Sequence, residues 1–108
     1  MDQITFDEFK KIELVVGEIK AIDDHPNANK LYVMTVDIGT EERQLVAGLK
    51  PYYEREQLLG KRIIIVANLA PAQLRGVESN GMLLAAQSGE RVIILTTDDD
   101  MPPGAKVS

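Results

Sequence analysis

Cysteine and tryptophan are absent from the 108-residue sequence, and histidine occurs once, at position 25. Without cysteine the chain can form no disulfide, thiolate zinc site, iron–sulfur cluster or cysteine nucleophile, and this composition agrees with a reducing compartment. The sequence also lacks an apolar run near the roughly 20 residues of a membrane span and the basic and apolar regions of a signal peptide. We therefore predict a cytoplasmic protein with no membrane partner.

Groups that could build an active site are equally scarce. The single imidazole, His25, precedes Pro26 in a polar turn, where we expect an exposed histidine that shapes the turn. No phosphate-binding loop is present, and the run Asp98–Asp100 lacks the alternating spacing of a calcium loop. These observations predict a chain with no catalytic residue, no metal site, no cofactor and no small-molecule substrate.

Length and charge indicate one folded domain with an uneven surface. With 44% hydrophobic and 27% charged residues, the chain has room for one core, and we expect a single domain over residues 1–108. Acidic residues outnumber basic ones by 10 to 4 in residues 1–42, whereas basic residues outnumber acidic ones by 6 to 2 in residues 43–75. A chain with a net charge of -5 can therefore still present a local positive face.

Hydrophobic patterning predicts an all-β fold with short helices. Thr5 and Glu8 have the spacing of a capping box, which predicts a helical turn to about Lys11, packed by Phe6 and Phe9. Extended segments rich in apolar residues follow it. They cover residues 12–22, 31–38, 43–47, 61–67, 82–86 and 91–95.

The order of these segments narrows the fold. Residues 51–59 begin with proline and contain no β-branched residue, so we expect a short helix between the third and fourth strands. Gly17 predicts a bulge or bend in the first strand, residues 71–81 read as a loop, and a C-terminal extension includes residues 106–107. This order is that of an OB-fold, a five-stranded Greek-key barrel whose open face takes nucleic acid or oligosaccharide.

Four segments, in this order along the chain, together resemble one family. They are His25–Tyr32 (His-Pro-Asn-Ala-Asn-Lys-Leu-Tyr), Val46–Leu49, Val66–Pro71 and Arg75–Ala86. They resemble the tRNA-binding domain at the C-terminus of many methionyl-tRNA synthetases, which also occurs as free-standing tRNA-binding proteins. The resemblance covers nearly the whole chain. It implies an OB-fold that recognises the elbow-like shape of tRNA without reading its sequence, and that usually forms a homodimer.

The resemblance also implies which side chains contact tRNA. The tRNA-contacting residues of the family fall on Lys30, Ser79 and Met82, with Asn68 and Arg75 nearby. An ammonium at Lys30 suits a phosphate, the Ser79 hydroxyl suits a sugar or base edge, and the Met82 thioether can lie against a base or ribose. Each residue also has an ordinary structural interpretation, and for Met82 the sequence leaves open whether the side chain faces the groove or the core.

One departure from the family bears on affinity. Ala72 and Gln73 occupy positions where the family often has a basic pair. Because each lost cation removes a possible phosphate contact, we expect weaker, more salt-sensitive binding than the family reaches at its best.

Three functions remain open at this level. The leading one is a non-catalytic, homodimeric accessory domain that brings tRNA to the catalytic body of methionyl-tRNA synthetase. The second is a dimeric, export-related chaperone of the same fold that binds unfolded peptide in an apolar cleft. The third is a dimerisation module whose tRNA contact is vestigial.

Overall fold

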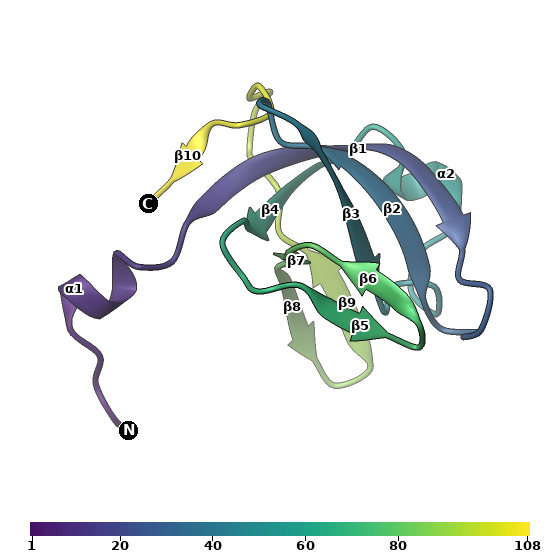
Figure 1. The fold of residues 1–108 in the computed structure, drawn as a ribbon, viewed down its shortest axis with the longest axis horizontal. Coiled ribbons are helices and arrows are strands. Elements are labelled where there is room, and N and C mark those ends of the chain that lie inside the picture. Colours follow the sequence, from purple (N-terminus) through teal and green to yellow (C-terminus); the bar gives the residue numbers. More distant parts are fainter.

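Strand β1 (Leu14–Asp24) is the central element of the structure, a computed structural model that describes all 108 residues (Figure 1). Its second half pairs with β2, and its first half pairs with β4 on one edge and β10 on the other, all antiparallel. The main sheet has the order β3-β2-β1-β4-β7, with β10 beside β1. Its other strands are β2 (Tyr32–Asp37), β3 (Glu42–Ala47), β4 (Arg62–Val66), β7 (Met82–Leu83) and β10 (Lys106–Val107).

The two ends of this sheet approach each other and nearly close a barrel. The Asn80 amide donates to the Gln44 carbonyl at 2.8 Å, which joins the corner before β7 to β3. The Arg43 guanidinium spans the same junction and donates to the carbonyls of Ala67 and Asn80. A nearly closed antiparallel barrel of this kind, with short helices, confirms the predicted fold class.

The barrel encloses a core to which β1, β2, β3 and β4 contribute buried side chains, and Leu83 of β7 packs against it. Strand β2 alternates buried and half-buried residues, as expected for period two, whereas Ile63, Ile64 and Ile65 of β4 are all buried. This confirms the extended segment predicted over residues 61–67, whose continuous apolar run is typical of a strand covered on both sides or of one that closes a barrel. The core cluster contains Ile19, Ile22, Tyr32, Met34, Val36, Ile38, Leu45, Leu49, Leu58, Ile63, Ile65 and Ile94.

Two short helices lie where the sequence predicts them. Helix α1 (Phe6–Phe9) has the expected capping box, since the Glu8 amide donates to Thr5 Oγ1 at 3.1 Å and the Thr5 amide donates to Glu8 Oε1 at 3.0 Å. However, α1 stands away from the barrel (Figure 1), and Phe6 is 72% exposed rather than packed. Helix α2 (Arg55–Leu58) lies between β3 and β4 and buries Leu58 in the core.

The predicted loop over residues 71–81 is wrong, because most of it forms a hairpin. Strands β5 (Ala72–Leu74) and β6 (Val77–Ser79) pair through a two-residue turn at Arg75 and Gly76. Both turn residues have positive φ, 54° and 88°, as a type I′ hairpin turn requires. The strands are too short for a visible alternation of polar and apolar residues, so only this turn could have revealed them.

Two further features refine the predicted strands. The irregularity expected at Gly17 lies between Ile19 and Ala21. Gly17 instead permits close packing, since a Cβ there would lie 2.6 Å from Val36 Cγ1. The extended segment predicted over residues 82–86 divides into β7 and β8 (Ala85–Ser88), and β8 forms an antiparallel hairpin with β9 (Arg91–Ile94).

Candidate nucleic-acid interface

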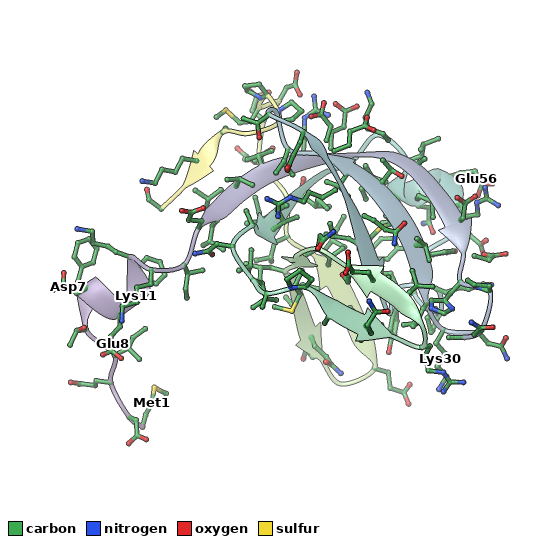
Figure 2. The ribbon with its side chains drawn as sticks, viewed as in Figure 1. Met1, Asp7, Glu8, Lys11, Lys30 and Glu56 are labelled. Atoms are coloured by element: carbon green, nitrogen blue, oxygen red, sulfur yellow. The ribbon has the colours of Figure 1, made fainter.

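A hollow of about 390 Å³ lies at one end of the barrel, between the β1–β2 loop and the β5–β6 turn. We call it the cationic pocket. Figure 2 shows Lys30 at this end, far from α1. Two of the predicted site residues, Lys30 and Arg75, are therefore brought to the same hollow from distant parts of the chain. The pocket is lined by Asn27, Ala28, Asn29, Lys30, Leu31 and Arg75.

The backbone presents Arg75 in an unusual way. Arg75 is the one non-glycine residue with positive φ, a conformation that costs roughly 1–2 kcal/mol in an L-residue. Two contacts with the β1–β2 loop accompany it: Arg75 Nη2 donates to the Asn27 carbonyl at 3.2 Å, and Asn27 Nδ2 lies 3.4 Å from the Arg75 carbonyl. The guanidinium is thus held against the loop that carries Lys30.

His25 also connects the β1–β2 loop to the β5–β6 hairpin. It is buried, with 6% of its surface exposed, so the expectation of an exposed loop histidine is wrong. The Asn27 amide donates to Nδ1 at 2.9 Å, and Nε2 lies 2.9 Å from the Leu74 carbonyl. Because a carbonyl only accepts hydrogen bonds, Nε2 carries the proton and Nδ1 is the acceptor.

Arg75, like Lys30, differs in ion pairing from most other cations of the basic block, the name we give to residues 43–75. Arg43, Lys50 and Arg62 each lie within 4 Å of a carboxylate, at Glu41, Asp24 and both Glu18 and Asp100 respectively. Lys30 and Arg75 face no carboxylate within that distance. Their charges are therefore available to an anionic ligand.

An apolar groove of about 390 Å³ adjoins the cationic pocket. A Cβ at Gly48, which lines the groove, would touch Leu31 Cδ2 of the pocket at 3.8 Å. Leu74 lines the groove and Arg75 lines the pocket, so one hairpin serves both. Eleven residues line the groove, all of them hydrophobic except Gly48 and Gln87: Val46, Ala47, Gly48, Leu49, Tyr52, Leu74, Met82, Leu83, Ala85, Gln87 and Val92.

Met82 belongs to this groove and not to the core. Its side chain is 49% exposed and lines the groove together with Tyr52, which is 42% exposed. The position of Met82 answers the question that the sequence left open. Tyr52 and Leu74 were not among the predicted site residues, because their positions beside Met82 depend on the fold.

The other two predicted site residues use their polar atoms within the protein. Ser79 is 4% exposed; its hydroxyl accepts from the Val46 amide at 3.0 Å and donates to the Gly81 carbonyl at 2.9 Å. Asn68 Oδ1 accepts from the Glu13 amide at 2.8 Å, and its Nδ2 donates to the Lys11 carbonyl. Neither residue lines the cationic pocket or the groove.

A buried tyrosine supports the wall of the groove. Burial, and to a lesser extent the charges of Glu54 and Asp24, raise the pKa of the Tyr32 phenol above its ordinary value of 10.0. The Tyr32 hydroxyl donates to the Tyr53 carbonyl at 2.7 Å, and the Tyr53 hydroxyl accepts from the Ile94 amide at 3.1 Å. These bonds fix the segment that bears Tyr52.

The structure contains no cluster of three or more His, Asp or Glu side chains that could hold a metal ion. Neither of its helices has the length or apolarity to cross a membrane.

Comparison with known proteins gives concordant results. Residues 14–106 match the family described as "Putative tRNA binding domain". A methionine–tRNA ligase from Thermococcus kodakarensis is 57% identical over 107 residues, which make up 99% of this chain and 14% of that protein. The chain therefore spans only a small part of the ligase that it matches.

Two solved structures share the whole fold. A MetRS related protein from Pyrococcus horikoshii superposes with a TM-score of 0.93 at 37% identity, covering 100% of both chains. A CsaA chaperone protein from Picrophilus torridus has a TM-score of 0.90 at 32% identity and covers 98% of this chain and 100% of its own.

Proposed function

Since this chain belongs to the family of tRNA-binding domains, we propose that it binds tRNA where the cationic pocket and the apolar groove meet. One observation carries this proposal. Lys30 and Arg75, cations without carboxylate partners, converge on one hollow from separate segments. Phosphates are the groups that such a pair attracts most strongly.

Each surface suits one part of a folded RNA. Lys30 meets phosphate as a point charge and Arg75 meets it as a planar fork, and both release counterions on binding. The groove accepts the apolar face of a ribose or base against Met82 and Tyr52. Contacts to phosphate and sugar carry no base identity, so binding follows the shape of tRNA and not its sequence.

Ser79 and Asn68 have positioning roles in this proposal. Ser79 fixes the corner that leads into β7 and so directs Met82 toward the groove. Asn68 lies in the loop after β4 and bonds to the backbone of Lys11 and Glu13. It thereby attaches the end of the N-terminal arm, residues 1–12, to that loop. Ser79 therefore acts on tRNA binding through Met82, whereas Asn68 positions the arm.

The proposal includes a homodimer. The N-terminal arm, residues 1–12, leaves Ile4, Phe6, Phe9 and Ile12 exposed on a segment that stands away from the barrel (Figure 1). Apolar side chains grouped on a projecting arm lose unfavourable contact with water when a second copy covers them. A symmetric exchange of such arms gives a closed dimer.

The domain is an accessory to catalysis performed elsewhere. The T. kodakarensis ligase matches this chain over 14% of its own length, and the chain itself offers one buried imidazole, already engaged by two backbone groups. In this proposal the domain supplies a second binding site for tRNA beside the catalytic body of a synthetase and catalyses no reaction itself. Binding at a tethered second site raises the effective concentration of tRNA at that body.

The test is a filter-binding titration of bulk tRNA at several salt concentrations. Lys30→Ala and Arg75→Ala should each flatten the slope of log affinity against log salt by about 0.7–0.9 and weaken binding by at most about fivefold, which is ~1 kcal/mol. Lys61→Ala is the matched control, because Lys61 is exposed, has no carboxylate partner and lies outside the pocket. It should bind like the parent.

The same titration separates the competing functions. Parent-like binding by both pocket variants, with a loss in Lys61→Ala or Arg55→Ala, moves the site to the remaining cations of the basic block. Preference for an unfolded peptide over tRNA selects the chaperone function, which the apolar groove and the similarity to the CsaA chaperone protein support. Binding of neither ligand by a dimer leaves a dimerisation module.

A further inference from the structure

We propose that His25 is a positioning residue for tRNA binding: its imidazole joins the β1–β2 loop to the β5–β6 turn and thereby holds Arg75 opposite Lys30. The inference rests on the proposed function and deepens it. It goes beyond the pocket itself, because His25 does not line the pocket and is buried beneath it.

The two ring nitrogens act on different segments. Nδ1 accepts from the Asn27 amide, which is a contact within the β1–β2 loop. Nε2 donates to the Leu74 carbonyl, and that bond crosses to the hairpin immediately before Arg75. Only the second bond joins the segments that carry the two cations.

The hairpin has few other attachments at its turn. At its base, Gln44 donates to the Glu78 carbonyl at 2.8 Å and the Ser79 hydroxyl accepts from β3. At its turn, the hydrogen bonds to the β1–β2 loop come from His25 and Asn27 alone. Without the His25 bond only the contacts between Asn27 and Arg75 tie the turn to the loop. The turn is then less restrained, and Arg75 loses more conformational entropy when it meets a phosphate.

His25 also differs from a histidine that merely fills space. Each of its ring nitrogens has a backbone partner at 2.9 Å. The expected consequence of losing the cross-segment bond is therefore a local loosening of the turn, with a larger effect on tRNA affinity than on the folding of the barrel.

Two conservative variants separate the two bonds. In His25→Asn, the side-chain oxygen can still accept from the Asn27 amide, as in an Asx turn, but the side chain is too short to reach Leu74. In His25→Gln, the longer side chain places an amide donor near the position of Nε2. The proposal predicts that Gln restores what Asn loses.

The experiment measures tRNA affinity at three salt concentrations, together with melting temperature, for the parent, His25→Asn and His25→Gln. His25→Asn should weaken binding several-fold and flatten the salt slope toward that of Arg75→Ala, while His25→Gln should recover most of both. In the Arg75→Ala background, His25→Asn should cause no further loss, because His25 acts through Arg75.

Equal losses in the Asn and Gln variants, or a full additional loss in the Arg75→Ala background, would overturn the positioning role. A failure of the proposed function gives a different result, because Arg75→Ala then binds tRNA as tightly as the parent. If His25→Asn does not fold, nitrogen-15 NMR spectroscopy of the single imidazole in the parent protein tests the proposal instead. The Nε2-protonated form is expected, with slower exchange of that proton when tRNA is added; unchanged exchange contradicts the proposal.

Discussion

At the scale of single residues, the buried Ser79 hydroxyl makes two hydrogen bonds at the barrel junction. Ser79→Ala removes the acceptor for the buried Val46 amide, and an unpaired buried amide costs about 1–3 kcal/mol. We expect a lower melting temperature and an unchanged slope of tRNA affinity against salt, because a neutral group releases no counterion. Ser88→Ala, on exposed β8, is the control. A parent-like melting temperature would contradict this assignment.

Replacing Met82, in contrast to Ser79, should affect tRNA affinity more than stability. Because its side chain is half exposed, Met82→Ala should cost clearly less stability than the roughly 2–5 kcal/mol of a buried methionine. A thioether contact with an aromatic ring is worth about 0.3–1.5 kcal/mol, and tRNA affinity should fall accordingly. Met101→Ala removes a similarly exposed methionine outside the groove and should leave affinity unchanged. Thermal melts and binding titrations of the two variants decide the matter.

Tyr32 makes stability sensitive to alkaline pH. Its pKa is raised in the folded state by burial and by nearby carboxylates, so the unfolded chain releases the phenolic proton first. The stabilising contribution is complete below the ordinary pKa of 10.0 and is lost as pH rises above it. Denaturant titrations between pH 9 and 11 should show a steeper fall for the parent than for Tyr32→Phe. If stability falls with pH equally in the parent and in Tyr32→Phe, ionisation of the Tyr32 phenol does not affect the free energy of unfolding.

At the scale of elements, sequence reasoning succeeds where local chemistry decides. The capping box of Thr5 and Glu8 and the isoleucine run of β4 depend on neighbouring residues, and both were predicted correctly. The β5–β6 hairpin was missed because its three-residue strands are held by contacts with β3 and the β1–β2 loop. The meeting of Lys30 with Arg75 was implied only by family resemblance, since tertiary folding alone brings these segments together.

The N-terminal arm gives the prediction that belongs to this scale. Changing both Phe6 and Phe9 to Ser alters four side chains of a symmetric dimer, and each buried phenylalanine contributes about 1.5–3 kcal/mol, so the dimer should weaken on the order of 10,000-fold or more. The barrel itself should melt nearly as before, because neither side chain reaches the core. Sedimentation equilibrium measures the change, with Leu59→Ser, an exposed site on the barrel, as control. A parent that is monomeric at micromolar concentration would refute the dimer.

At the scale of the whole molecule, an acidic chain brings two cations without carboxylate partners to one end of its barrel. The net charge is -5, yet several cations outside the pocket face carboxylates, while Lys30 and Arg75 do not. Composition predicted that a positive face could form, and the basic block suggested residues 43–75 as its source. The structure divides that block, since Arg43, Lys50 and Arg62 are ion-paired and Arg75 joins a lysine from the acidic third of the chain.

Both chain termini lie on one side of the molecule, and Lys30 lies on the other (Figures 1 and 2). The longest dimension of the molecule is 39 Å, so a group attached at either terminus is held well away from the pocket. For the tRNA binding proposed above, this geometry makes either terminus a suitable point of attachment. When the domain is coupled through either terminus to a bead or sensor chip, the pocket stays open to solution, and a fluorophore attached at a terminus does not compete with RNA for the pocket.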